Sequence, residues 1–192
     1  MTQIYDRVAL IGLGLIASSM SHAIKRAGLA GEVVGYARSE ATRQTARDIG
    51  LCDQIYNSAA EAVEGADLIV LCVPVGAMDR VAQDIAPYLK AGAVVSDVGS
   101  VKRAVIDAVA PHLSDNVHFV PAHPLAGTEH SGPTSGFAEL FDPQGDPAAV
   151  TVDYINSRVV DQSALQAIEA IAVKYELLGK SLQLRHLSSD CH

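Results

Sequence analysis

One residue pattern near the N-terminus has the spacing to bind phosphate. The chain reads Gly-Leu-Gly-Leu-Ile-Ala from Gly12 to Ala17, directly after an apolar run and at the start of an amphipathic stretch. We expect Gly12 to make a tight turn, Gly14 to let a pyrophosphate approach the backbone, and Ala17 to keep the helix close to the sheet. The free N–H groups and the positive end of that helix then bind phosphate, with Ser18 and Ser19 as further donors. This turn predicts a dinucleotide site; the alternative is an ordinary glycine-rich turn.

The end of the next apolar run bears on which nicotinamide dinucleotide binds. Sites for NAD usually place a carboxylate there, which accepts hydrogen bonds from the ribose. Here Arg38 and Ser39 stand at that point instead. A guanidinium is suited to a 2′-phosphate, so we expect NADP, with NAD as the alternative if Arg38 is a solvated surface charge. The expected cofactor-binding residues are Gly12, Gly14, Leu15, Ile16, Arg38, Ser39, Val73 and Pro74.

Two later segments carry groups for acid–base chemistry. Ser100 lies in Ser-Asp-Val-Gly-Ser-Val-Lys, and His123 lies in Pro-Ala-His-Pro-Leu-Ala-Gly-Thr-Glu; each segment follows an apolar run. Ligands of an open parallel sheet bind beyond the carboxyl ends of its strands, so both loops are expected to face the nicotinamide. An imidazole ordinarily titrates near neutral pH, which makes His123 the acid–base candidate and Ser100 its partner or a ligand of a substrate oxygen. The alternative for His123 is a structural histidine bonded to backbone.

The elements that must position these groups alternate along the chain. Apolar runs predict strands at 8–13, 32–36, 67–73, 93–97 and 117–121, and amphipathic stretches predict helices at 16–27, 41–49, 58–63, 77–89 and 102–112. Strands separated by helices imply right-handed crossovers, so the predicted fold class is α/β, a doubly wound parallel sheet of the Rossmann type. Later, we predict a strand at 150–155 and a helix at 163–178, closed by Gly179, while 180–192 gives no firm pattern.

Composition bounds the class of protein. The 192 residues are 49% hydrophobic, enough for a sizeable core, and the net charge of −8 makes nucleic acid and anionic membranes poor partners. Cys52, Cys72 and Cys191 are far apart, which fits a reducing cytoplasm better than a disulfide framework. The N-terminus lacks the pattern of a signal peptide, no apolar run has the roughly 18 residues of a membrane span, and no spacing resembles a metal site.

Three motifs in order resemble the prephenate/arogenate dehydrogenase family of tyrosine biosynthesis. They are 11–16 (Ile-Gly-Leu-Gly-Leu-Ile), 97–102 (Asp-Val-Gly-Ser-Val-Lys) and 123–129 (His-Pro-Leu-Ala-Gly-Thr-Glu), followed by Ser131-Gly132 and Gly136-Phe137. The resemblance runs from about residue 4 to 141. It implies oxidative decarboxylation of prephenate or arogenate, with hydride passed to NAD(P).

The resemblance also implies roles for single residues. His123 matches the catalytic histidine that bonds the ring hydroxyl and draws off its proton, and Ser100 matches the serine that assists it. Thr128, Glu129 and Ser131 match the substrate side of the site. Ala17 stands where many family members have glycine.

The end of the chain departs from the family pattern. Family members continue with an all-helical domain that forms the dimer and completes the substrate pocket, and His192 stands about where that domain begins. We therefore expect a nucleotide-binding domain over 1–179, atypical at 141–162, and a tail at 180–192 that starts the helical domain. Cofactor binding should survive, turnover should be weak or absent, and a homodimer is expected only with the helical domain. Two other functions stay open: a non-catalytic NAD(P)-binding module or truncated remnant, and another Rossmann reductase acting on an imine or hydroxy acid.

Overall fold

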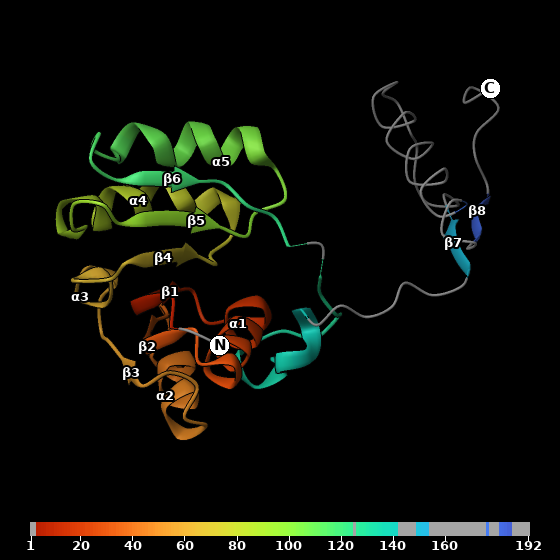
Figure 1. Ribbon diagram of the computed structural model, residues 1–192, viewed down its shortest axis with the longest axis horizontal. Helices are drawn as coiled ribbons and strands as arrows, with labels where there is room; N and C mark the ends of the chain where they lie inside the picture. Colours follow the sequence, from red (N-terminus) through yellow and green to blue (C-terminus); the bar gives the residue numbers. More distant parts are fainter. Residues whose placement is uncertain (1–2, 125, 142–148, 154–175, 177–180, 186–192) are drawn as a thin grey trace. The chain divides into compact units, whose positions relative to one another are not determined.

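The fold is dominated by one parallel sheet with helices on both faces (Figure 1). The computed structural model describes residues 3–124, 126–141, 149–153, 176 and 181–185. The chain divides into two compact units, Met1–Asp142 and Pro143–His192. The strands of the first unit are β1 (Tyr5–Ile11), β2 (Ala30–Tyr36), β3 (Gln54–Ile55), β4 (Leu68–Leu71), β5 (Val94–Asp97) and β6 (His118–Val120). Its α-helices are α1 (Leu15–Ala27), α2 (Glu40–Asp48), α3 (Ala59–Val63), α4 (Met78–Ile85) and α5 (Lys102–Val109).

The strand order is β3-β2-β1-β4-β5-β6, and every pair is parallel. Leu10 of β1 stands opposite Gly35 of β2 on one side and Val70 of β4 on the other. The order reverses between β1 and β4, which is where sheets of this kind bind ligands at the carboxyl ends of their strands. The predicted doubly wound parallel sheet is therefore confirmed, and its reversal point coincides with the Gly12 turn.

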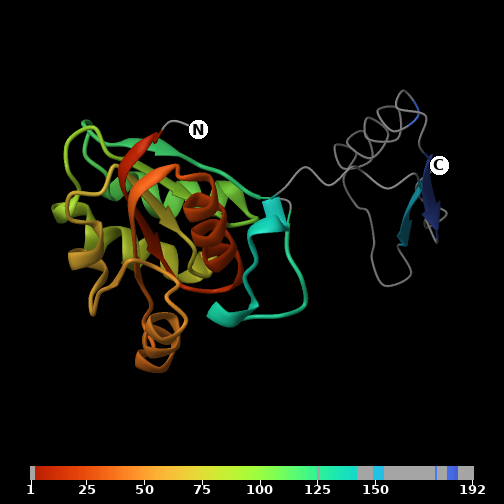
Figure 2. The same cartoon turned by 60° about the horizontal axis from the view of Figure 1, so that its bottom comes forward.

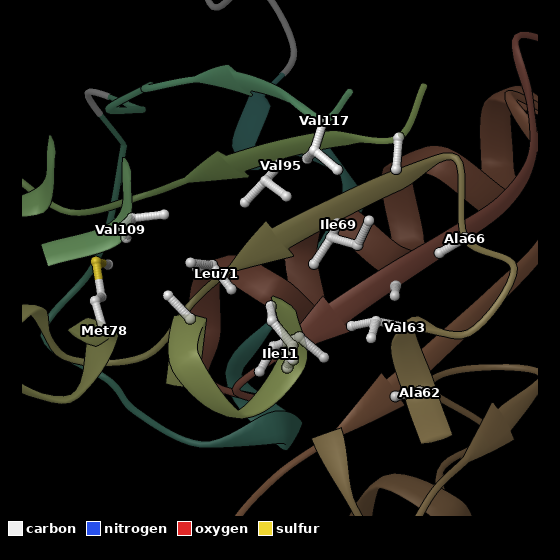
Figure 3. Close-up of a cluster of buried hydrophobic side chains, with 14 of the residues drawn as sticks. Ile11, Ala62, Val63, Ala66, Ile69, Leu71, Met78, Val95, Val109 and Val117 are labelled. Carbon is white, nitrogen blue, oxygen red and sulfur yellow. The ribbon is translucent and has the colours of Figure 1, made fainter. Parts of the chain in front are cut away.

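The central strands are almost continuously apolar because both faces of the sheet are covered. On one face, a buried cluster joins Ile11, Ile69, Leu71 and Val95 to side chains of α3, α4 and α5 (Figure 3). On the other face, a second cluster joins Val8, Leu10, Val33 and Val70 to Ala17 of α1 and Ala46 of α2. These two cores fix the six strands, so the loops that leave their carboxyl ends start from rigid positions.

Several boundaries differ from the sequence prediction for local reasons. The first and third predicted strands end two residues early, at Ile11 and Leu71, because the chain turns at Gly12 and again before Pro74. The helices predicted at 77–89 and 102–112 finish as 3-10 turns, η2 (Ala86–Tyr88) and η3 (Ala110–His112). Each turn contains a proline, which has no N–H for the α-helical ladder. Strand β3 was missed because it is only two residues long.

The second unit contains a parallel pair of strands, β7 (Ala149–Asp153) and β8 (Ser181–Arg185). The predicted strand at 150–155 is confirmed with a one-residue shift at its start and an end at Asp153. Strand β8 was missed, since 180–192 showed no alternation strong enough to predict it. The predicted helix at 163–178 lies outside the described residues except for Glu176, which is helical. The expected domain extent of 1–179 stays a prediction.

Candidate active site

The turn after β1 is held by backbone contacts on two sides. Gly12 has φ +100°, and its N–H donates to the carbonyl oxygen of Tyr36 at 2.8 Å. A Cβ at Gly12 would lie 2.7 Å from the carbonyl oxygen of Cys72 and 2.9 Å from Cγ1 of Val73. Glycine is therefore required here for both its positive φ and its lack of a side chain. The turn is wedged between the carboxyl ends of β2 and β4.

Among the residues that the structure describes, no side chain accepts a hydrogen bond from the first N–H groups of α1. Gly14 is the N-cap, no side chain makes a capping hydrogen bond, and the first turn contains no acidic residue. A Cβ on Gly14 would meet nothing within 4 Å, so there is open space where a ligand would approach the backbone. The first turn of a helix offers unpaired N–H groups and a positive dipole end, which favour an anion. The donor set and the open space fit a pyrophosphate.

The residues behind the turn fall into two groups. Ala17 is fully buried against the sheet, as predicted for a small residue that keeps α1 close to the strands. Ser18 and Ser19, expected as phosphate donors, are also fully buried. The Ser19 hydroxyl accepts the N–H of Phe137 at 3.1 Å, and a Cβ on Gly136 would lie only 2.3 Å from that of Ser18. The two serines therefore pack against the later segment and are closed to solvent, which corrects the expectation that they are accessible phosphate donors.

This later segment consists of η4 (Pro133–Ser135) and η5 (Ala138–Phe141), and both lie beside α1 in Figures 1 and 2. Arg26 of α1 contacts Glu139 at 3.1 Å, which adds a polar contact to the packing. The segment returns the chain from the His123 loop to the helix that carries the glycine turn. The His123 loop and the Gly12 turn, which form the two parts of the candidate site, are thus linked through α1.

The end of β2 presents a cluster of charge around the expected ribose side. Arg38 and Ser39 are exposed, and Ser39 caps α2 by accepting the N–H of Thr42 at 3.5 Å. Arg43 donates to the carbonyl oxygens of Ala37 and Arg38, at 2.7 and 2.9 Å, and lies 5.7 Å from the ring centre of Tyr36. Sequence reasoning missed Arg43, although one helical turn after Ser39 places it there.

Glu40 follows Ser39 and is already paired. Its carboxylate accepts from Arg47 at 3.0 Å and from Arg43, and these hydrogen bonds hold the pKa of Glu40 below its ordinary value. The Glu40 carboxylate is therefore paired with two guanidinium groups, whereas Arg38 is exposed to solvent. A ligand at the end of β2 would meet positive charge first.

Val73 and Pro74 lie where the sequence placed them, at the exit of β4. Val73 is beside the Gly12 turn, as the 2.9 Å approach to a Cβ on Gly12 shows. Pro74 is exposed, and its carbonyl oxygen accepts the N–H of Ala77 at 2.8 Å. The structure thus places Val73 beside the glycine turn and Pro74 next to it in the chain; their contact with a cofactor stays a prediction.

A buried carboxylate dominates the exits of β5 and β6. Asp97 is 1% exposed. Its Oδ2 accepts the N–H of Gly99 at 2.7 Å and a hydrogen bond from Lys102, and its Oδ1 accepts the N–H of Ala122 at 3.1 Å. Lys102 also donates to the carbonyl oxygen of Ala122. Sequence reasoning quoted Asp97 and Lys102 in a motif but gave them no role, since their shared partner Ala122 is distant in sequence.

The two predicted catalytic residues flank this carboxylate. Ser100 follows Gly99, and His123 follows Ala122, so both belong to loops that Asp97 ties together. Both side chains are exposed, and no hydrogen bond joins them in the described part of the chain. An exposed imidazole at the carboxyl edge of the sheet is accessible to a substrate. The catalytic assignment of His123 and Ser100 stays a prediction.

The three predicted substrate contacts lie on the exposed loop after His123. Thr128 Oγ1 accepts the N–H of His130 at 3.2 Å, and Glu129 lies 3.5 Å from the ring of His130. The carbonyl oxygen of Ser131 accepts from the Ser135 hydroxyl at 2.7 Å. These local bonds shape the loop, while its side chains remain exposed to solvent. Substrate contact by Thr128, Glu129 and Ser131 stays a prediction.

Other site types find no support in the described residues. Within those ranges, no three His, Cys, Asp or Glu side chains gather where they could hold a metal ion. The helices of that part are also too short or too polar to cross a bilayer. At the carboxyl edge, the described residues present backbone donors, the His123 imidazole, the Ser100 hydroxyl and the Asp97–Lys102 pair.

A family comparison decides what this arrangement belongs to. Residues 20–153 match the family described as prephenate dehydrogenase, nucleotide-binding domain. The chain belongs to the prephenate dehydrogenase family. A cyclohexadienyl dehydrogenase of Zymomonas mobilis is 41% identical over 189 residues, which is 98% of this chain and 60% of that protein. A prephenate dehydrogenase of Lactococcus lactis is 34% identical over 141 residues, 71% of this chain and 38% of that protein.

Solved structures agree on the fold of this prephenate dehydrogenase family member. The prephenate dehydrogenase of Aquifex aeolicus, in complex with hydroxyphenyl propionate and NAD+, has a TM-score of 0.65 at 24% identity, covering 96% of this chain and 60% of that one. The arogenate dehydrogenase of Synechocystis has a TM-score of 0.63 at 25% identity, covering 96% of this chain and 61% of that one. The chain thus spans about three fifths of the length of these relatives.

Proposed function

We propose that this chain is the NAD(P)-binding part of a dehydrogenase that decarboxylates prephenate or arogenate oxidatively. The supporting observation is the arrangement at one edge of the sheet. The uncapped N-terminus of α1 follows β1, and the loops of Ser100 and His123 follow β5 and β6. Family membership and the NAD+ complex of the Aquifex aeolicus relative add to this support.

The residues of this chain would act on a cyclohexadienyl ring as follows. His123 accepts the proton of the ring hydroxyl, and the electrons of that O–H bond form a carbonyl as the hydride on the same ring carbon leaves. The nicotinamide, when bound, would accept that hydride. The carboxylate leaves as CO2, the electrons of its broken C–C bond enter the ring, and the carbonyl oxygen takes up a proton, which gives the aromatic phenol. Ser100 assists His123, while Thr128, Glu129 and Ser131 contact the substrate side.

The choice of cofactor follows from charge at the end of β2. The Glu40 carboxylate is engaged by Arg47 and Arg43, so it is poorly placed to accept a bond from a ribose hydroxyl. Arg38 is exposed at the strand end and suits a 2′-phosphate. This arrangement favours NADP over NAD. A cytoplasmic location, expected from the sequence, completes the proposal, and a homodimer is expected only together with the helical domain of the family.

The test is turnover by this chain with prephenate or arogenate, each with NAD and with NADP, followed by absorbance of the reduced nicotinamide. We expect His123→Asn to reduce kcat by about 10²- to 10⁴-fold, as for loss of a general base. The matched control is His118→Asn, because His118 is exposed on the same segment five residues earlier. Cofactor binding without turnover in the unmodified chain would favour a non-catalytic binding module instead.

A further inference from the structure

The Asp97–Lys102 pair has no part in the proposed mechanism, yet it is the most enclosed charge contact at the site. The Asp97 side chain is 0% exposed and that of Lys102 is 31% exposed. Taking a carboxylate out of water costs several kcal/mol, which a partner repays only with good geometry and further hydrogen bonds. Asp97 has those bonds, so the pair is a built feature of the fold.

The bonds of this pair connect the segment that follows β5 with the segment that follows β6, beyond the last paired residues of the two strands. One carboxylate oxygen holds Gly99 and Lys102, on the loop and helix after β5. The other holds the N–H of Ala122, two residues beyond the end of β6. Lys102 closes the ring by donating to the Ala122 carbonyl oxygen. Both backbone polar groups of Ala122 are thus bound by this one ion pair, after the sheet ladder has ended.

The loop after β5 is shaped to fit the carboxylate. A Cβ on Gly99 would lie 2.9 Å from Val105, 3.1 Å from Val75 and 3.2 Å from Asp97 Oδ2. A side chain at this position would require Val105 to shift, so glycine suits the packing of this loop between α5 and the exit of β4. The residue after Gly99 is Ser100, so the packing that fixes Gly99 also sets the origin of the serine side chain.

The geometry points to Asp97 and Lys102 as positioning residues that fix His123 and Ser100 relative to each other. This inference rests on the proposed function for its catalytic consequence. Each candidate catalytic residue is covalently next to a group that Asp97 binds, Ser100 next to Gly99 and His123 next to Ala122. The ion pair acts through the backbone and does not touch the reacting atoms. Removing its charge loosens the imidazole, whereas the backbone contacts of the Gly12 turn with Tyr36 and Cys72 do not depend on that charge.

A second ion pair in the same sheet provides a matched control. Asp67 binds Lys90 at 2.5 Å through one oxygen and the N–H groups of Asp6 and Arg7, both at 2.8 Å, through the other. It therefore has the same design, a carboxylate shared between a lysine and two backbone donors. Asp67 precedes β4, so it lies at the opposite edge of the sheet from the candidate site.

The experiment compares Asp97→Asn, Lys102→Met, Lys102→Arg and Asp67→Asn in the whole chain. The readouts are kcat and KM, calorimetric binding of NADP, and the NMR signals of the histidine imidazoles, with His123 assigned from His123→Asn. We expect Asp97→Asn to lower kcat by about 10²-fold with little change in KM or NADP affinity, the scale of a small misplacement. The His123 signals should move while those of His112 and His118 stay. Lys102→Arg should retain more activity than Lys102→Met.

The controls separate this inference from simpler explanations and from the proposed function. Asp67→Asn should lower thermal stability without changing kcat or the His123 signals. The positioning role would be overturned if Asp97→Asn left kcat and the His123 signals unchanged. It would also be overturned if Asp67→Asn altered kcat and the His123 signals as much as Asp97→Asn does. If the unmodified chain bound NADP but turned over neither substrate, while Asp97→Asn still moved the His123 signals, the dehydrogenase proposal would fail and the positioning role would stand.

Discussion

Two parts of the same sheet edge are held in different ways. The glycine turn after β1 is fixed by backbone contacts and by the absence of a side chain, with Gly12 wedged against Cys72 and bonded to Tyr36. The loops after β5 and β6 are fixed by charge, with Asp97 and Lys102 binding backbone groups from both. The first region should therefore respond to added bulk, and the second to removed charge.

The difference suits what each region is proposed to bind. A dinucleotide phosphate carries its own negative charge, so a carboxylate at the N-terminus of α1 would repel it, and the first turn contains none. A substrate loop has no such restriction, and a buried ion pair can hold it at two points. Backbone contacts thus hold the turn that is proposed to bind the cofactor, and a side-chain network holds the loops of the proposed catalytic pair.

The largest effect is expected from Gly12→Ala. The added Cβ would lie 2.7 Å from a carbonyl oxygen and would require a φ of +100°, which L-residues rarely adopt. NADP affinity should fall at least about 100-fold, and thermal stability should fall with it. Calorimetric titration and thermal denaturation measure the two effects.

Gly14→Ala sharpens this result, because a Cβ there meets no protein atom within 4 Å. It should lower NADP affinity by filling the phosphate space, but leave thermal stability unchanged. Equal stability losses in both variants would contradict the distinction between a packed glycine and an open one.

The next effect concerns charge at the cofactor side. Arg38→Ala should weaken NADP by about tenfold or more and NAD little, because the lost charge-assisted bonds reach only the 2′-phosphate. The control is Arg80→Ala, an exposed arginine on α4 that pairs with Asp84 at 3.8 Å. If Arg38→Ala weakened both dinucleotides equally, the argument for NADP would be lost.

A smaller effect is expected from Asp67→Asn, at about 1 kcal/mol of unfolding free energy at neutral pH. The hydrogen bond from Lys90, followed by the N–H of Arg7, holds the pKa of Asp67 below its ordinary value of 3.8. A lowered pKa stabilises the folded chain at higher pH, and this contribution disappears as the pH falls below 3.8. Denaturation curves should show a gap between the two proteins at neutral pH that narrows in acid. A constant gap would contradict the role of the ionised carboxylate.

A further effect is confined to alkaline pH and concerns the buried thiol of Cys52, in the core that also contains Leu13 and Ala17. Burial raises its pKa from 9.0 to about 11, so the folded chain disfavours the thiolate. Stability from this group is complete below pH 9 and declines as the pH rises toward 11. Between these pH values, Cys52→Ala should lose less melting temperature than the unmodified chain. Equal losses would show that the thiol does not titrate in this way.

The sequence predicted the fold well where the signals were local. The apolar runs of β1, β4 and β5 and the Gly12 turn depend on neighbouring residues, so strand type and order along the chain were readable. Strand β3 is two residues long and gains its structure from pairing with Val34 and Gly35, which no local pattern announces. The 3-10 turns η2 and η3 each contain one proline, and the helical pattern around these prolines hid the point at which the α-helix ends.

The sequence predicted which residues lie at the site better than it predicted the partners that these residues contact. Asp97 and Lys102 were visible as part of a motif, but their common partner Ala122 can be found only when β5 and β6 are placed side by side. Ser18 and Ser19 were given to the phosphate because they follow the turn. Their actual neighbours, Gly136 and Phe137, are far along the chain. Long-range packing decided both cases.

The most direct test of the account is a crystal structure of this chain with bound NADP. We predict that pyrophosphate oxygens lie about 3 Å from backbone N–H groups at the start of α1, with the nicotinamide toward the His123 imidazole. A pyrophosphate bound away from Gly12 and Gly14, or a His123 ring turned away from the nicotinamide, would contradict it.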